Sequence, residues 1–360
     1  EKDKMEGDKH SDSTKNNTND HRLPDAPEAR EQSTPSHKGK LLMDATVAPQ
    51  NITFPTDLKL LNAARKKSEQ LIDKLYNPHI HEREKPRTYR EIARKEFLNT
   101  AKKKSKSQKE IYKANGKQLR FLRRNLSHIE ALLQAYQTKG IEPKLKQKDY
   151  AYLQTIEMVY QQQLEMFTNR SHRVENRIVN IHQPYVRPIV RGKESKKVEF
   201  GSKLQVSLIA GFALLDKLSW DNFNEGQYLQ NSVEAYRSRF GFYPEEVLAD
   251  QIYCNRENRK YLKNLGIKLR AKPLGRPSSE ALSIPVSPGE RNPIEGKFGQ
   301  AKVKYGLANI GAKLKSTSES WIATIILVLN LVNLTRLNLL RLIQRFIQQW
   351  NYLFLSRLSF

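Results

Sequence analysis

Two apolar runs of strand length contain or end in an aspartate, and this pattern constrains the fold of the chain more than any other. In "KGKLLMDATVAP", Asp44 is surrounded by Leu, Met, Ala and Val side chains. In "PEEVLADQIY", Asp250 follows a short apolar run. An ionised carboxylate in such a setting is costly unless a cation or hydrogen-bond donors accompany it. Each acid therefore either caps the turn after its strand or belongs to a charged site built at strand ends.

The spacing of apolar residues between and after these segments predicts an α/β protein. Helical periodicity follows Thr56 or Asp57, the candidate N-caps, and recurs to about residue 168. Residues 198–220 alternate around Gly211, which is typical of a β-hairpin. The segment after Asp250 predicts a helix with Asn255 as its N-cap, and the strand "IKLRAK" follows it. This order favours a mixed sheet with a large helical insertion after the first strand.

Composition divides the chain into five segments. Residues 1–39 contain no Phe, Trp or Tyr and are predicted to form a disordered linker. We expect the first part of an α/β core in 40–56, a basic helical insertion in 57–183 and the remainder of the core in 184–318. The C-terminal segment 319–360 is expected to form apolar helices that pack on the core. Asn and Arg side chains interrupt its most apolar stretch, which favours a buried helix over a membrane span.

The charge of the chain indicates a polyanionic partner. Sixty-three Lys and Arg against thirty-eight Asp and Glu give a formal net charge of +25. The excess is densest in 85–124, where fifteen basic residues accompany three glutamates. Nucleic acid and an acidic membrane surface both fit this charge, and a solvated helix face is the alternative for the basic block. A membrane-surface role leaves the acids at strand ends unexplained. The single cysteine, Cys254, excludes a disulfide framework and a cysteine-based zinc site.

The segment "RNPIEGKFGQAK" places a third carboxylate between two cations. At helical spacing, Arg291, Glu295 and Lys302 share one face, and Glu295 is expected to begin the helix. Ordinary charge pairing on a solvated helix is the alternative. Three carboxylates gathered near a phosphate would suit hard divalent cations, which prefer oxygen ligands and promote in-line phosphoryl displacement.

Three segments resemble the catalytic blocks of DDE transposases. They are "LLMDATVAPQNITFPTDLKLLNAAR", "VLADQIYCNRENRKYLKNLGI" and "RNPIEGKFGQAKVKYGL". The sequence is most similar to bacterial and archaeal insertion sequences of family five, in the wider family-four-like group, over roughly residues 40 to 340. The resemblance implies a ribonuclease H-like core and a catalytic triad of Asp44, Asp250 and Glu295. Arg291, Glu295 and Lys302 match the group's Tyr, Arg, Glu, Lys pattern in spacing, but Pro288 stands in the place of the tyrosine.

The resemblance also implies an activity, a cofactor and partners. The triad is expected to ligate two Mg²⁺ ions, or Mn²⁺ in their place, and to catalyse DNA cleavage at transposon ends and strand transfer into target DNA. A homodimer in the synaptic complex, no membrane association and a cytoplasmic, nucleoid-associated location in a prokaryote are expected. A catalytically inactive DNA-binding protein derived from a transposase is the alternative. The residues expected to contact DNA are Arg291, Lys302, Lys304, Lys102, Lys103, Lys104, Arg123, Arg124, Arg191 and Lys193.

Overall fold

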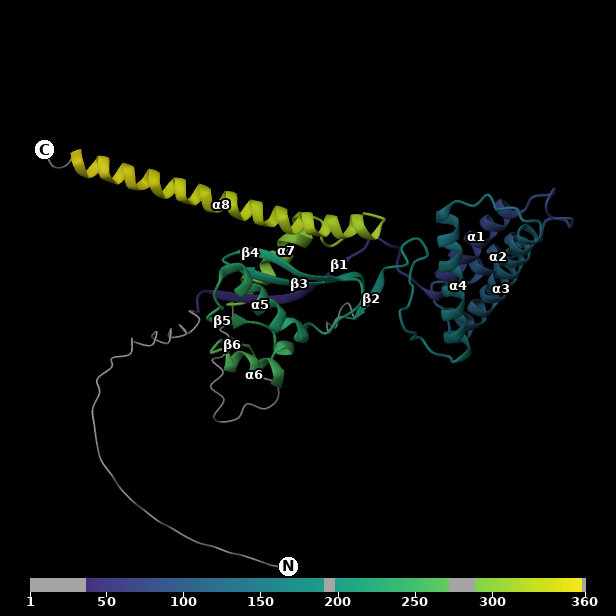
Figure 1. Cartoon of the computed structure of the whole chain (residues 1–360), viewed down its shortest axis with the longest axis horizontal. Coiled ribbons are helices and arrows are strands. Elements are labelled where there is room, and N and C mark those ends of the chain that lie inside the picture. The colour runs from purple at the N-terminus through teal and green to yellow at the C-terminus, as the bar shows by residue number, and fades with distance from the viewer. Residues whose placement is uncertain (1–36, 191–197, 272–288, 358–360) are drawn as a thin grey trace, which may run out of the picture. The chain divides into compact units, whose positions relative to one another are not determined.

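A mixed β-sheet forms the part of the fold that carries the acids. The computed structural model describes residues 37–190, 198–271 and 289–357, so the predicted linker lies almost entirely outside the described residues, and side chains are described to residue 349. Within these ranges a six-stranded sheet has the order β2-β3-β1-β5-β6, and β4 also pairs with β3 (Figure 1). The strands are β1 Lys40–Pro49, β2 Arg187–Val190, β3 Val198–Ile209, β4 Phe212–Ser219, β5 Glu246–Leu248 and β6 Lys268–Arg270.

The pairing of the strands confirms the predicted hairpin and makes the sheet mixed. The central strand β1 runs antiparallel to β3 and parallel to β5, and β5 runs parallel to β6. The hairpin joins β3 to β4 through Gly211, whose φ of +83° suits glycine. This mixed α/β arrangement is compatible with a ribonuclease H-like core.

The two faces of the sheet are covered by different helices because side chains alternate along β1. Leu41 and Met43 pack with α5 (Leu229–Phe240) and α6 (Arg256–Asn264), whereas Leu42 and Ala48 belong to the cluster of α7 (Asn292–Lys304) and α8 (Lys315–Arg357). Asp44 has the same parity as Leu42, so its side chain faces α7. Helix α7 was predicted to begin at Glu295, but it begins three residues earlier, at Asn292, because Pro293 is tolerated in the first turn of a helix.

The insertion after β1 is a block of four helices with a hydrophobic core of its own. Thr56 caps α1, as predicted, and Ser107 forms a capping box with Glu110 at the start of α3. The block's core includes Leu61, Leu122 and Ile156, each with no exposed surface. The helices are α1 Asp57–Leu75, α2 Arg90–Ala101, α3 Gln108–Thr138 and α4 Gln147–Thr168.

Helix α8 differs along its length. Ile322, Ile325 and Leu329 are buried against the sheet, and Asn330 makes two hydrogen bonds to the backbone of Ala213 in β4. Large apolar side chains that follow, from Leu339 onward, are exposed. By length and composition alone, Lys315–Gln349 could cross a membrane. The contacts of its first half with β4 are those of a core helix.

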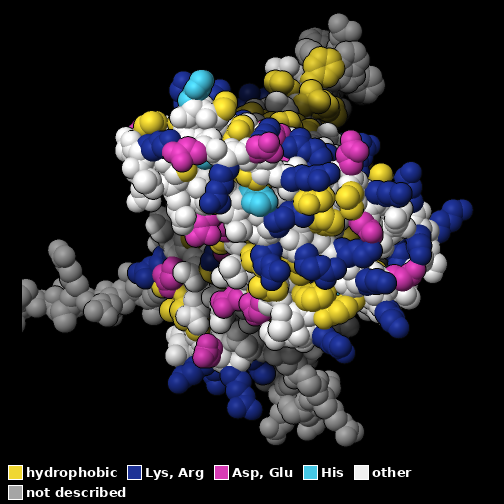
Figure 2. All heavy atoms as spheres, turned by 90° about the vertical axis from the view of Figure 1, so that its right-hand side faces the viewer, with side chains coloured by type: hydrophobic (Ala, Val, Ile, Leu, Met, Phe, Trp, Pro, Cys, Tyr) yellow, Lys and Arg dark blue, Asp and Glu magenta, His cyan; other side chains and the backbone are white. Residues whose placement is uncertain are grey.

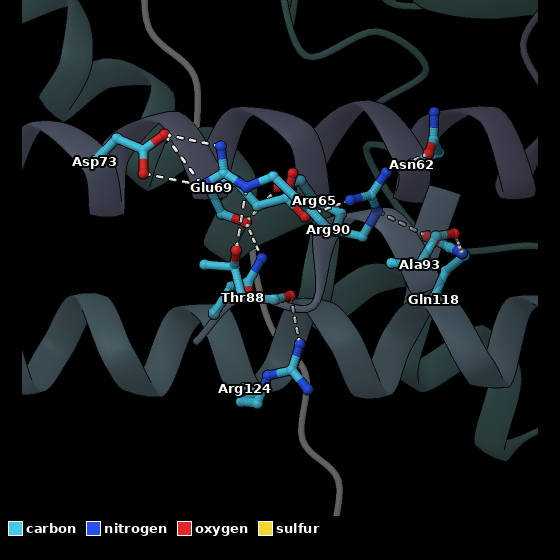
Figure 3. Close-up of polar contacts among 11 residues, drawn as sticks. Asn62, Arg65, Glu69, Asp73, Thr88, Arg90, Ala93, Gln118 and Arg124 are labelled. Carbon is cyan, nitrogen blue, oxygen red and sulfur yellow. Dashed lines mark hydrogen bonds and ion pairs between the residues drawn. The ribbon is translucent and has the colours of Figure 1, made fainter. Parts of the chain in front are cut away.

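A buried arginine joins three helices of the block. Arg65 is 2% exposed and forms an ion pair with Glu69. Its Nε donates a hydrogen bond to the side chain of Gln118, and its Nη2 donates one to the side chain of Asn62 (Figure 3). Gln118 in turn donates to the backbone of Ala93 in α2. Burial raises the pKa of Glu69, and the Arg65 guanidinium opposes that rise.

Replacing Arg65 by Ala is expected to destabilise the helical block by about 3 kcal/mol, since Glu69 loses its buried cation. Arg90→Ala is the matched control, because the Arg90–Asp73 pair is exposed and is expected to contribute less than about 1 kcal/mol. Amide hydrogen exchange in α1 and α3 measures both changes locally. Equal effects of the two substitutions would contradict the role given to Arg65.

Candidate active site

One cavity of about 580 Å³ gathers the three predicted acids with several cations. Asp44, Asp250 and Glu295 all line it. They come from β1, from the residue that caps the turn after β5, and from the first turn of α7. The other charged residues in its wall are Lys203, Glu225, Arg291 and Lys302.

The topology of the sheet explains why Asp44 and Asp250 meet. Parallel strands end at the same edge, and β1 and β5 are parallel neighbours. Asp250 lies two residues after the end of β5, where its Oδ1 accepts a hydrogen bond of 2.7 Å from the Gln251 amide at the start of a short 3₁₀ helix, Gln251–Tyr253. Asp44 therefore lies in the middle of a long strand, beside the turn that holds Asp250.

The Arg291 guanidinium bridges the two aspartates. Its Nη2 lies 3.1 Å from Asp44 Oδ2, and its Nη1 lies 3.3 Å from Asp250 Oδ1. Arg291 is the residue before α7, so the helix delivers both this cation and Glu295 to the cavity. Two carboxylates that share one guanidinium are within reach of a common cation.

The surroundings of Asp44 oppose its ionisation. Burial raises the pKa of Asp44 to about 6, and the carboxylates of Glu225 and Asp250 act in the same direction. Arg291 and the backbone amide of Ala45, which donates to Oδ1 at 2.8 Å, oppose this rise. A carboxyl with such a pKa is typical of functional sites.

The residues present fit a divalent cation in part. Asp44 and Asp250 line the same cavity and offer carboxylate oxygens, the ligands that hard metal ions prefer. Both carboxylates already pair with one cation, the Arg291 guanidinium. Within the ranges that the structure describes, however, His, Cys, Asp and Glu form no group of three close enough to hold a metal ion. Glu295 thus shares the cavity with the aspartates without completing such a group in this arrangement.

Two charged residues that line the cavity, Lys203 and Glu225, were not predicted from the sequence. Lys203 in β3 lies opposite Val47 of β1, and its Nζ is 3.1 Å from Glu225 and 2.8 Å from the carbonyl oxygen of Phe223. The sequence did contain a signal for Lys203: a lysine in an otherwise apolar hairpin strand needs a polar partner if it is buried. Glu225 lies in a segment with no motif, and its charge reaches Asp44 only through the fold.

The residues predicted to contact DNA have different surroundings. Lys302 lines the cavity, and Lys304 lies in the last turn of α7. Lys102, Lys103 and Lys104 are exposed after α2, and Arg123 is exposed on α3. Arg124 stacks on Tyr89 and donates to the carbonyl oxygen of Thr88 at 2.7 Å. Arg191 and Lys193 lie outside the described residues.

Removing the bridging cation is expected to shift the titration of Asp44. In Arg291→Ala the carboxylate loses the charge that favours its ionised form, so its pKa is expected to rise above the value of about 6. Carbon-13 NMR of aspartate-labelled protein reports this titration, and Arg239→Ala, an arginine that pairs with Asp216, serves as the control. An unchanged or lower pKa of Asp44 in Arg291→Ala would refute the bridge.

Comparison with known protein families agrees with this site. Residues 247–332 match the model of a transposase DDE domain, a segment that contains Asp250, Arg291, Glu295 and Lys302. A search of curated proteins found no match. The matched segment supports a DDE transposase, and with it a nuclease or transposase enzyme.

Proposed function

We propose that the protein is an insertion-sequence transposase that cleaves DNA at transposon ends and transfers the strands into target DNA. The observation that carries the proposal is the convergence of Asp44 and Asp250, from separate parts of the chain, on Arg291 in the cavity that Glu295 also lines. The match of 247–332 to a transposase DDE domain supports the same chemistry.

The cofactor in this proposal is Mg²⁺, with Mn²⁺ as a substitute. Asp44 and Asp250 would hold two ions, with Glu295 completing the site, and the ions would supply Lewis-acid stabilisation for in-line phosphoryl displacement. Water attacks the phosphodiester at a transposon end and frees a 3′ hydroxyl, which then attacks a target phosphodiester. No covalent intermediate with the protein is needed.

The basic side chains of the cavity would bind the phosphate groups of DNA. A DNA phosphate that approaches Asp44, Asp250 and Glu295 meets like charge, and Arg291 and Lys302 offset this repulsion because they line the same cavity. The Nε of Arg291 is buried and has no hydrogen-bond partner in the described part of the chain. Lys203 holds Glu225 at the edge of the site.

The helical block would bind the DNA backbone. Figure 2 shows a face on which Lys and Arg side chains outnumber acidic ones, with apolar side chains between them. The basic residues of 85–124 belong largely to α2, α3 and their connection. The proposed partner is double-stranded DNA, from transposon ends and target, and the protein would form a homodimer in the synaptic complex. We propose no membrane association and a cytoplasmic, nucleoid-associated location in a prokaryote.

Asp44→Asn is expected to lower the rate of strand cleavage in Mg²⁺ by about a thousandfold or more, since several kcal/mol of transition-state stabilisation depend on this ligand. Affinity for end-bearing DNA is expected to persist. Asp221→Asn is the matched control, because Asp221 is exposed outside the cavity. Full cleavage by Asp44→Asn would overturn the assignment, and an inactive wild-type protein that binds ends would favour the DNA-binding alternative.

Combined replacement of Lys102, Lys103 and Lys104 by Ala is expected to weaken DNA binding. Each lost phosphate contact reduces the slope of log affinity against log salt by about 0.9, so the slope is expected to fall by roughly two to three. Fluorescence anisotropy at several salt concentrations measures it. Lys144, Lys146 and Lys148, also exposed, provide a control with the same charge change outside the basic block. Equal losses in both variants would argue against a specific role for the block.

A further inference from the structure

Helix α7 has no side-chain N-cap, although it brings Arg291 and Glu295 to the cavity. The residue at the capping position is Arg291 itself, whose guanidinium pairs with Asp44 and Asp250 instead. Ile294, 1% exposed, packs the first turn of α7 onto the sheet. The position of Arg291 therefore depends on what holds the turn just before the helix.

The side chain of Arg270 in β6 contacts this turn. Its Nη2 lies 2.8 Å from Oε2 of Glu290, the residue directly before Arg291. Its Nη1 lies 3.5 Å from Oε2 of Glu246 at the start of β5, and Glu246 also pairs with Lys40 of β1 at 3.1 Å. The Arg270 side chain is 13% exposed, so these contacts are largely shielded from water. Two carboxylates that meet different nitrogens of one guanidinium fix its orientation.

The backbone of Arg270 contacts the other side of the bridge. Its carbonyl oxygen accepts a hydrogen bond of 3.2 Å from the amide of Ala249, the residue before Asp250. The parallel pairing of β5 and β6 places Leu248 opposite Arg270. Arg270 is thus joined through its backbone to the neighbour of Asp250 and through its side chain to the neighbour of Arg291. One residue therefore connects the two turns whose side chains pair at 3.3 Å.

We propose that Arg270 is a positioning residue: through Glu290 it holds the turn before α7, and with it the guanidinium of Arg291 between the two aspartates. Arg270 does not line the cavity, so it acts on the site through its neighbours. Without the pair the turn loses its side-chain contact with β6, and the long Arg291 side chain gains rotamers that leave the aspartates. The consequence for DNA cleavage rests on the proposed function, whereas the placement of Arg291 does not.

Nitrogen-15 NMR of arginine-labelled protein, without metal or DNA, measures this placement. The Arg291 guanidinium is expected to show slow rotation and separate Nη signals, which are identified by their loss in Arg291→Ala. Arg270→Ala is expected to speed the rotation by about tenfold or more, because the bidentate contacts of Arg291 are lost. Glu290→Ala is expected to do the same and leaves the Arg270–Glu246 pair in place, so it decides the matter even if Arg270→Ala unfolds. A guanidinium that rotates freely in the wild-type chain, or stays fixed in Glu290→Ala, would overturn the proposal.

Lys268→Ala is the matched control. Lys268 lies in the same strand, but its pair with Glu245 is exposed, by 59% and 57% for the two side chains. This variant is expected to leave the Arg291 signals unchanged, since an exposed pair contributes little. A change as large as that of Arg270→Ala would show that any loss of charge from β6 suffices, and the specific role of Arg270 would be wrong.

Cleavage of end-bearing DNA in Mg²⁺ separates positioning from general stability. Arg270→Ala is expected to lower the rate by about tenfold or more in the wild-type background, but by less than about twofold in the Arg291→Ala background, because its effect passes through Arg291. Equal factors in both backgrounds would contradict the positioning role. A wild-type chain that binds ends without cleaving them would overturn the proposed function instead, and the NMR comparison would then decide the placement of Arg291 by itself.

Discussion

The ion pairs of Arg291 with Asp44 and Asp250 are the interaction on which the account of the site depends. They join the middle of the first strand, the turn after the fifth and the start of a helix nearly 250 residues along the chain from Asp44. A buried carboxyl with a pKa of about 6 is destabilised as an anion, so a cation in this position stabilises the fold as well as the site. The same demand for positive charge is what a metal ion would meet in the proposed reaction.

The sheet determines which side chains can meet there. Alternation along β1 sends Leu41 and Met43 into one core and Asp44 toward the face covered by α7. The parallel pairing of β1 and β5 brings the Asp250 turn to the same edge. The four-helix block is inserted between β1 and β2 and has a hydrophobic core of its own, so it can carry the proposed DNA-binding face without disturbing the sheet.

Local signals in the sequence predicted much of this arrangement. The alternation around Gly211, the caps at Thr56 and Asn255, the strand that contains Asp44 and the strand just before Asp250 are confirmed, because each depends on neighbours within a few residues. Glu225 and Lys203 could not be predicted as cavity residues, since their proximity to Asp44 arises from strand pairing and a loop path. The bridging role of Arg291 was also unforeseen: helical spacing placed it beside Glu295, and only the fold places it between two aspartates. Apolar side chains recur throughout α8, so the sequence did not indicate that those from Leu339 onward are exposed while Ile322, Ile325 and Leu329 are buried.

The most direct test of the central claim is the position of Mn²⁺ in crystals of the protein, located by anomalous scattering. The account predicts a peak within coordination distance, about 2.0–2.3 Å, of carboxylate oxygens of both Asp44 and Asp250, with Glu295 drawn toward it and the Arg291 guanidinium displaced. Manganese bound only elsewhere, with Arg291 still between the two aspartates at saturating metal, would contradict it.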